Sequence, residues 1–172
     1  LELQDAYDNE AHERELRTLS WDKFTPAELA LLPTVMSLGG DGASYDIGFG
    51  AMSRILASDT PLKMLVLDSG AYSNTGGQAS TSSFTGQDSD LARFGGSHTG
   101  KHEARKELAL LASFHPHVYA CSTSTAFHGH FLATTLEYLG YQSAPAVMNV
   151  YTPCGSEHGI PESASNARAR MA

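Results

Sequence analysis

The chain has 172 residues, of which 41% are hydrophobic and 17% are charged, and its formal net charge is −8. This composition is typical of a soluble globular protein with one ordinary core, and the acidic balance argues against nucleic acid or an anionic membrane as the main partner. Two cysteines are too few for a disulfide framework, so we expect a reducing, cytoplasmic compartment.

The first part of the chain is predicted to form polar helices. Thr25, Pro26 and Glu28 follow the pattern of an N-cap, a first helical position and a capping-box glutamate. The N-terminus is acidic, and no apolar run approaches the roughly 18 residues that would span a bilayer. We expect a helical segment over 1–32 and an α/β region over 33–172, which together make one domain. Because the chain does not begin with Met, we also expect it to be a piece of a longer protein.

After residue 33, apolar runs alternate with amphipathic ones. The runs predict strands over 34–40, 62–68, 117–123 and 144–152, and helices over 44–58, 102–114 and 125–141. The first two strands suit burial in a sheet, the first helix carries Ile47, Met52, Ile55 and Leu56 as apolar side chains, and Gly140 should end the last helix. This order predicts an α/β fold with a doubly wound, mostly parallel sheet.

Two unusual loops follow the first two strands, at 39–43 and 69–78. In such sheets ligands lie beyond the carboxyl ends of the strands, so the two loops should face one another there. The second opens a long segment, 69–100, that is rich in Ser, Thr and Gly, and a loop of that length inside a domain is more often functional than idle.

Asp41 is the unexpected residue of the first loop, "SLGGDGASYDIGFG". Glycine-rich turns before helices usually bind phosphate through backbone N–H groups, and a carboxylate there would repel phosphate unless a cation lay between them. Mg²⁺ takes a few protein oxygens and completes its shell with phosphate and water. The second loop, "LDSGAYSNTGG", offers the Ser69 hydroxyl and the Ala71 carbonyl as further ligands. The alternative is a turn aspartate between glycines.

A dinucleotide-binding turn is the other interpretation of these glycines. Its G-x-G-x-x-G pattern needs a glycine three residues after Gly42, where this chain has Tyr45. The 26 residues between Gly42 and Ser69 instead suit a helix and a strand that separate two metal-binding loops.

The segment from Gly39 to Ser80 resembles the thiamine-diphosphate domain of pyruvate:ferredoxin (flavodoxin) oxidoreductases. The phrases "YDIGFG", "VLDSGAYSNTGGQ" and "TGKHEARKELALLA" carry the resemblance, which extends from about residue 33 to 160. It implies a thiamine-diphosphate-binding fold in a larger enzyme that converts pyruvate or a related 2-oxoacid to acyl-CoA.

The resemblance also implies roles for individual residues. Asp41, Ser69 and the Ala71 carbonyl would hold Mg²⁺, and Asn74 would approach the thiazolium and the 2-oxoacid. The residues expected around the diphosphate are Gly40, Gly42, Ala43, Tyr72 and Ser73. The family usually has a bulky aromatic residue at Ala43, Thr at Ser69 and Val at Ala71. The alternative for Asn74 is a left-handed turn position before "TGG".

Cys154 follows the last predicted strand and, on the same resemblance, matches the fourth ligand of a [4Fe–4S] cluster. The other three cysteines would come from an earlier segment that this chain lacks. Cys121 lies in an apolar run and is predicted to be a core thiol. The "HPH" and "HGH" histidines lack a partner cluster at ligand spacing and predict surface residues.

The leading hypothesis is therefore a catalytically incomplete piece of a 2-oxoacid oxidoreductase. Its partners would be the remaining domains of the parent enzyme, a 2-oxoacid, coenzyme A, and ferredoxin or flavodoxin, and the parent should be a homo-oligomer. The alternative is a non-catalytic thiamine-fold remnant with an assembly role. The sequence leaves open which 2-oxoacid and which electron acceptor are used.

Overall fold

The structure is a computed structural model that describes residues 8–31, 33–89 and 100–172. The chain divides into two units, one that ends at Pro33 and one that begins at Thr34. In the described part, no helix is both long enough and apolar enough to cross a membrane.

The first unit contains α1 (Asn9–Arg17), a 3₁₀ turn η2 (Trp21–Lys23) and α2 (Pro26–Leu29). The predicted capping box at α2 is confirmed. The Thr25 hydroxyl accepts the Glu28 backbone N–H at 3.3 Å, and the Glu28 carboxylate accepts the Thr25 N–H at 2.8 Å. These two bonds satisfy backbone donors that a helix start leaves without partners.

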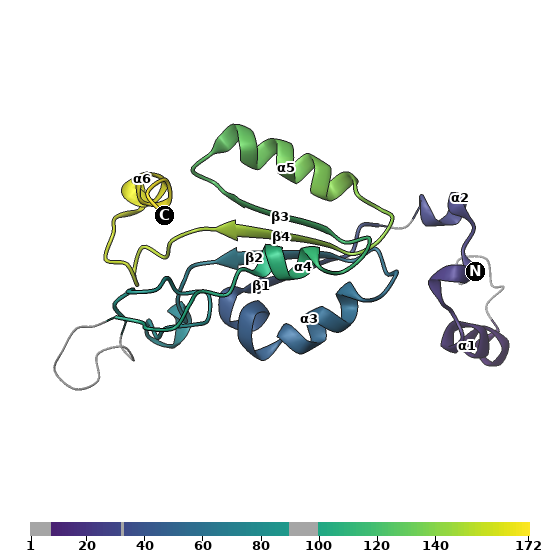
Figure 1. The fold of residues 1–172 in the computed structure, drawn as a ribbon. Coiled ribbons are helices and arrows are strands. Elements are labelled where there is room, and N and C mark those ends of the chain that lie inside the picture. The colour runs from purple at the N-terminus through teal and green to yellow at the C-terminus, as the bar shows by residue number, and fades with distance from the viewer. Residues whose placement is uncertain (1–7, 32, 90–99) are drawn as a thin grey trace. The chain divides into compact units, whose positions relative to one another are not determined.

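The second unit is built on a four-stranded sheet (Figure 1). Its strands are β1 (Met36–Gly40), β2 (Lys63–Asp68), β3 (Tyr119–Ser124) and β4 (Ala146–Tyr151). They lie in the order β1-β2-β4-β3, and every neighbouring pair is parallel. The predicted parallel sheet is therefore confirmed.

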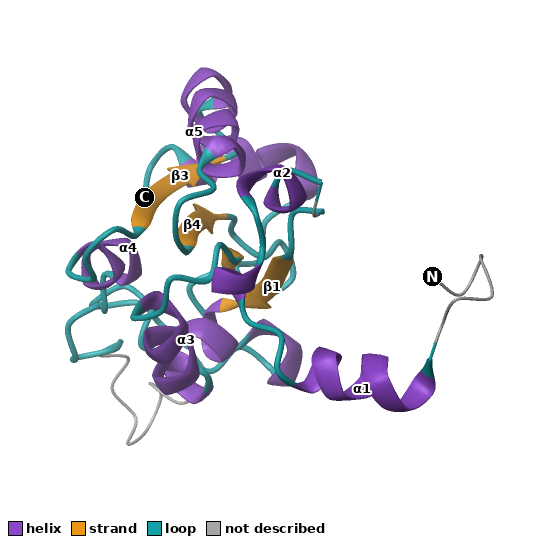
Figure 2. Ribbon diagram, turned by 90° about the vertical axis from the view of Figure 1, so that its right-hand side faces the viewer, coloured by secondary structure: helices purple, strands orange, loops and turns teal. Residues whose placement is uncertain are grey.

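Helices cover both faces of this sheet, as a doubly wound fold requires (Figures 1 and 2). The covering helices are α3 (Phe49–Leu56), α4 (Leu108–Ser113) and α5 (His128–Gly140), whereas α6 (Ser165–Ala169) lies beyond the carboxyl ends of the strands. Met52 and Leu108, from α3 and α4, pack with Val66 on one face. On the other face Tyr138 of α5 packs with Met148. Side chains alternate along each strand, so β4 contributes to both cores.

The expectation that the first strand is buried is wrong. β1 is an edge strand, and Leu38 at its centre is 65% exposed. Ile47, one of the apolar residues of the predicted first helix, is 92% exposed. The segment predicted as one helix starts with a wide π-helical turn, η3 (Gly42–Ile47), and restarts after Gly48. The wider turn rotates Tyr45 into the core in place of Ile47.

The helix predicted over 102–114 is shorter than expected, because only α4 (Leu108–Ser113) forms. The preceding residues are held by contacts with distant segments. The Lys106 N–H donates to the Thr81 carbonyl at 2.9 Å, and Arg105 forms an ion pair with Asp68 at 2.7 Å. These tertiary contacts outweigh the local preference for a helix. α5, by contrast, ends at Gly140 as predicted.

Candidate functional site

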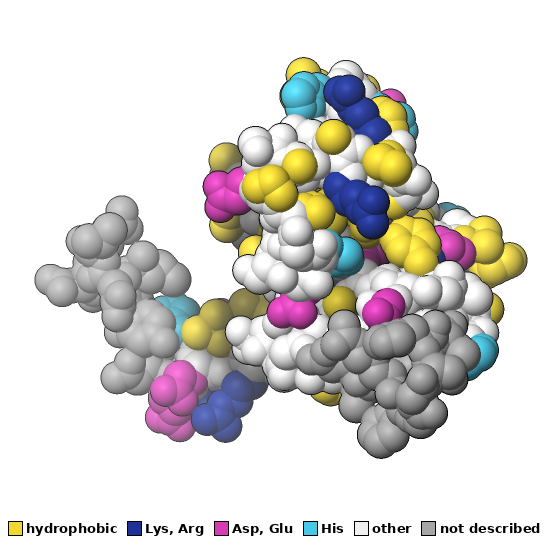
Figure 3. All heavy atoms as spheres, turned by 90° about the vertical axis from the view of Figure 1, so that its left-hand side faces the viewer, with side chains coloured by type: hydrophobic (Ala, Val, Ile, Leu, Met, Phe, Trp, Pro, Cys, Tyr) yellow, Lys and Arg dark blue, Asp and Glu magenta, His cyan; other side chains and the backbone are white. Residues whose placement is uncertain are grey.

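The two loops predicted to face one another meet at the carboxyl edge of β1 and β2. They line a cavity of about 530 Å³. Every residue predicted to bind thiamine diphosphate or Mg²⁺ lies on its wall: Gly40, Asp41, Gly42, Ala43, Ser69, Ala71, Tyr72, Ser73 and Asn74. Ile47, Gly48, Leu67 and Thr75 complete the lining. Figure 3 views the molecule from this edge, where hydrophobic and uncharged groups make up most of the visible surface of the second unit.

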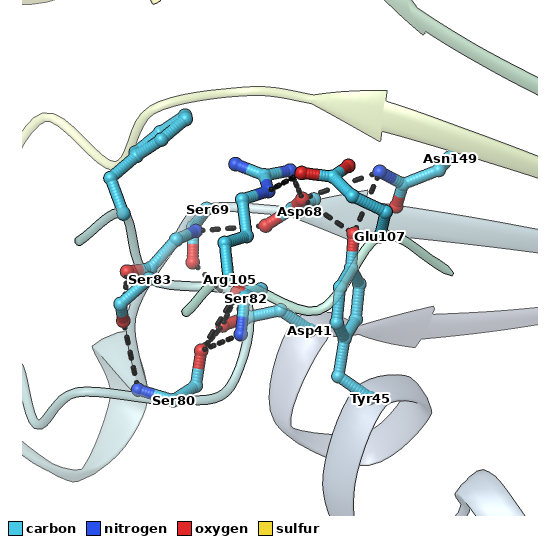
Figure 4. A network of polar contacts seen from close by, with 12 residues as sticks. Asp41, Tyr45, Asp68, Ser69, Ser80, Ser82, Ser83, Arg105, Glu107 and Asn149 are labelled. Atoms are coloured by element: carbon cyan, nitrogen blue, oxygen red, sulfur yellow. Dashed lines mark hydrogen bonds and ion pairs between the residues drawn. The ribbon is translucent and has the colours of Figure 1, made fainter. Parts of the chain in front are cut away.

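Asp41 follows directly on the last residue of β1, and its side chain is buried. Three serine hydroxyls donate to its carboxylate (Figure 4). Ser80 and Ser82 donate to Oδ2 at 2.6 and 2.8 Å, and Ser69 donates to Oδ1 at 3.2 Å. All three donors are neutral, so the negative charge of the carboxylate remains available to a cation.

The Ser69 hydroxyl lies at the distance of a neighbouring octahedral ligand from each of the other two predicted metal ligands. The Ser69 hydroxyl oxygen lies 3.2 Å from Asp41 Oδ1 and 3.0 Å from the Ala71 carbonyl oxygen. With bonds of about 2.1 Å, neighbouring ligands of octahedral Mg²⁺ stand about 3 Å apart. The donor set of carboxylate, hydroxyl and carbonyl is one that Mg²⁺ prefers. These residues therefore fit the ion.

Gly42 cannot carry a side chain here, because a Cβ atom would lie 2.5 Å from the Tyr72 ring. Asp46 holds that ring in place. Its carboxylate accepts from the Tyr72 hydroxyl at 2.5 Å and from the Thr81 hydroxyl at 2.6 Å. Burial, and then the hydrogen bond to Asp46, raise the pKa of Tyr72 to about 12. Burial alone would raise the pKa of Asp46, but the bonds from Thr81 and Tyr72 outweigh it and lower that pKa.

A second buried carboxylate, Asp68, ends β2 immediately before Ser69. It accepts hydrogen bonds from the Tyr45 hydroxyl at 2.9 Å, the Gly70 N–H at 3.0 Å and Arg105 Nη2 at 2.7 Å. Asn149 of β4 donates at 3.3 Å. Burial and the neighbouring Asp68 charge raise the pKa of Tyr45. Asp68 therefore joins four segments next to Ser69, a residue of the cavity wall.

Five residues of this site were not predicted from the sequence: Asp46, Asp68, Ser80, Ser82 and Arg105. The available signals were the Ser/Thr-rich composition of the 69–100 segment and the aspartate at the end of an apolar strand. Neither shows which partner a side chain meets. Part of the predicted loop, residues 90–99, lies outside the described residues.

The cysteines lie away from the predicted metal ligands in sequence. Cys121 is in β3, and burial raises the pKa of its thiol to about 11. Cys154 follows β4 on the edge of the sheet where the strands end, and both thiols are free.

His130, in the first turn of α5, has its Nδ1 2.8 Å from the Thr123 hydroxyl. Among the described residues, no group of three or more His, Cys, Asp and Glu could hold a metal ion.

A second cavity of about 550 Å³ opens where β3 and β4 end. Arg105, His130 and Tyr151 are among its lining residues. None of the residues predicted to bind cofactor or metal lines this second cavity. The guanidinium of Arg105 is already bound to Asp68 and stacks on the Phe84 ring at 4.4 Å.

Comparison with known proteins places this geometry in context. Residues 26–149 match the family model described as "Thiamine pyrophosphate enzyme, C-terminal TPP binding domain". The pyruvate:ferredoxin oxidoreductase of Moorella thermoacetica is 37% identical over 140 residues, which cover 81% of this chain and 11% of that protein. The pyruvate-flavodoxin oxidoreductase of Trichormus variabilis is 38% identical over 135 residues, which cover 78% of this chain and 11% of that protein.

The fold is also found in a solved structure. The 2-oxoglutarate:ferredoxin oxidoreductase of Magnetococcus marinus, with 2-oxoglutarate, coenzyme A and succinyl-CoA bound, superposes with a TM-score of 0.65 at 18% identity. The match covers 84% of this chain and 47% of that chain. The chain thus spans about a tenth of the length of these two curated relatives, since each match covers 11% of the relative.

Proposed function

Because the chain belongs to the thiamine pyrophosphate enzyme family, as its C-terminal TPP binding domain, we propose that it is the diphosphate- and Mg²⁺-binding part of a 2-oxoacid oxidoreductase. The parent enzyme would oxidatively decarboxylate pyruvate or a related 2-oxoacid to acyl-CoA. Ferredoxin or flavodoxin would accept the electrons. The names of the relatives support this proposal.

In this proposal Asp41 Oδ1, the Ser69 hydroxyl and the Ala71 carbonyl bind Mg²⁺, which in turn binds the diphosphate. The backbone turn at Gly40, Gly42 and Ala43 and the side chains of Tyr72 and Ser73 surround the diphosphate. Asn74 is exposed on the same wall, where it would meet the thiazolium and the substrate. The observation that carries the proposal is that the Ser69 hydroxyl lies 3.2 Å from Asp41 Oδ1 and 3.0 Å from the Ala71 carbonyl oxygen, and that the donors to Asp41 among the described residues are all neutral.

The chain's own residues would bind and orient, while thiamine diphosphate, when bound, supplies the electron sink for decarboxylation. Thiamine enzymes also need a carboxylate against the aminopyrimidine, which in the resembling family comes from another domain. The remaining domains of the parent are therefore the first partners expected. The alternative, a non-catalytic remnant with an assembly role, predicts no turnover by the parent.

Cys154 would ligate a [4Fe–4S] cluster only in such a parent. A cluster of this type takes four thiolates, and the whole chain contains two cysteines. The position of Cys154 beyond β4, on the edge where the cavity opens, supports a role near the cofactor.

The test is Asp41→Ala in the polypeptide that carries this chain. Removing the carboxylate should abolish retention of Mg²⁺ and thiamine diphosphate, measured by metal analysis and cofactor release, and should leave the circular dichroism spectrum unchanged. Asp59→Ala is the matched control, because Asp59 is an exposed carboxylate before the other end of β2. Normal cofactor retention in Asp41→Ala would refute the proposal.

A further inference from the structure

Ser80 and Ser82 are buried serines whose hydroxyls meet the same carboxylate oxygen. Their side chains are 3% and 0% exposed. Each donates to Asp41 Oδ2, at 2.6 and 2.8 Å, and the two hydroxyl oxygens lie 2.7 Å apart. The three oxygens form a closed triangle, although the serines lie 39 and 41 residues beyond Asp41 in the chain.

This triangle distinguishes the two oxygens of the Asp41 carboxylate. Oδ2 is occupied by two buried donors, whereas Oδ1 is directed to the Ser69 hydroxyl at 3.2 Å. That hydroxyl in turn lies 3.0 Å from the Ala71 carbonyl. Rotation of the carboxylate would break two hydrogen bonds to buried hydroxyls, and buried hydroxyls without partners are unfavourable.

The turn that holds these serines is itself attached to β2. The Ser80 N–H donates to the Ser83 hydroxyl at 2.9 Å, and that hydroxyl donates to the Gly70 carbonyl at 2.6 Å. The Gly70 N–H is bound to Asp68, at the end of β2. The serine pair therefore has a fixed position relative to Ser69.

We infer that Ser80 and Ser82 are positioning residues for the cation site: they hold Asp41 Oδ2 and so present Oδ1 to the metal, without being ligands themselves. This inference rests on the proposed function. Hydrogen bonds from residues behind a ligand commonly fix its orientation, and their loss weakens metal binding by about 10- to 100-fold.

The first experiment needs no ligand. In the 172-residue chain, Asp41→Ala, Ser80→Ala and their double variant form a cycle, with the unfolding midpoint as readout. If the hydroxyl acts through the carboxylate, the shift in the double variant is clearly smaller than the sum of the two single shifts. Additive shifts would overturn the inference, whether or not the chain binds metal.

The second experiment measures Mn²⁺ affinity by electron paramagnetic resonance in the complete parent polypeptide with thiamine diphosphate. Ser80→Ala and Ser82→Ala should weaken Mn²⁺ binding about 10- to 100-fold. Ser124→Ala is the matched control, since Ser124 is a buried serine at the end of β3 whose hydroxyl accepts the Ala126 N–H, and it should leave the Mn²⁺ affinity unchanged.

The outcomes separate the inference from the proposed function. Wild-type Mn²⁺ affinity in both Ser80→Ala and Ser82→Ala would overturn the positioning role while the proposed function stood. Equal weakening by Ser124→Ala would also overturn it, because the effect would then come from a general disturbance of the fold rather than from the serines beside Asp41. If the wild-type parent bound no Mn²⁺, the proposed function would fail instead. Recovery of affinity in Ser80→Thr, which retains a hydroxyl, would support the role.

Discussion

Asp41 and Asp68 are both buried carboxylates at strand ends, and their partners give them different roles. Asp68 meets the guanidinium of Arg105 as well as neutral donors, so its charge is already balanced. Asp41 receives serine hydroxyls, which stabilise a carboxylate without neutralising it. The arrangement around Asp68 is therefore structural, whereas the arrangement around Asp41 leaves a negative charge for a cation.

Lys63 is a further buried charge, at the start of β2, with no hydrogen-bond partner for its ammonium among the described residues. Its nitrogen lies 5.5 Å from the Tyr141 ring centre and 5.9 Å from that of Tyr138. We predict that Lys63→Met raises the free energy of unfolding at pH 7 by about 1–3 kcal/mol, because a buried donor without a partner is removed. Urea denaturation measures this, and a loss of stability would contradict the prediction.

The stabilisation expected for Lys63→Met should depend on pH, with a definite sign. Burial lowers the pKa of Lys63, so over the range between the folded and unfolded pKa values the unfolded chain binds more protons. The wild-type protein therefore gains stability as the pH rises through the folded pKa towards the ordinary value. The advantage of Lys63→Met should be largest near neutral pH and should shrink towards pH 10.

The two thiols should react differently. Burial raises the pKa of Cys121 to about 11, so at pH 8 roughly one thiol in a thousand is the reactive thiolate. We predict that iodoacetamide at pH 8 labels Cys154 well before Cys121, as measured by mass spectrometry of peptides. In urea the difference should disappear, and equal labelling of the folded chain would contradict the prediction.

At the scale of elements, the segment before α4 shows a tertiary contact prevailing over a helical pattern. Arg105 is largely buried against Asp68, which is completely buried. We predict that Arg105→Ala lowers the free energy of unfolding by roughly 3–5 kcal/mol, because it leaves a buried charge without its partner. Denaturant titration of Arg105→Ala tests this.

The matched variant is Arg105→Ala combined with Asp68→Asn. Neutralising the aspartate removes the unpaired charge, so the double variant should be more stable than Arg105→Ala alone. If it is less stable, the unpaired charge of Asp68 is not what destabilises Arg105→Ala.

At the scale of the whole molecule, part of the sheet is left without a cover by the described residues of the second unit. α5 packs over β3 and β4, so Met36 and Leu38 of β1 and Leu67 of β2 are exposed on the same side (Figure 1). Leu132 and Leu136 on the outer side of α5 are exposed as well. Parallel sheets are normally covered on both faces. The short span of this chain relative to its relatives is consistent with further domains in the parent.

The isolated chain should not decarboxylate pyruvate or another 2-oxoacid. On the proposed function, the residues of this chain would bind only the diphosphate and the metal, and binding at that end cannot by itself orient the reactive carbon. Calorimetry should show weak or absent binding of thiamine diphosphate with Mg²⁺, and assays with coenzyme A and a dye acceptor should show no turnover. Steady turnover by the purified chain would refute this prediction.

The sequence predicted the elements whose signal is local. Strands β2 and β4, the end of α5 and the α2 cap all follow from short patterns of apolar residues and capping residues. The wall residues of the cavity were also predictable, because parallel strands bring their following loops to one edge.

The sequence by itself determined the parallel α/β architecture and the meeting of Asp41 with Ser69, because periodicity and strand direction are properties of the local chain. Only the tertiary structure decided that Ser80 and Ser82 reach Asp41, that Arg105 leaves a helical pattern for Asp68, and that Leu38 is exposed. Contacts between residues about forty positions apart carry no periodic signal. They depend on which buried polar groups must find partners once the chain has packed.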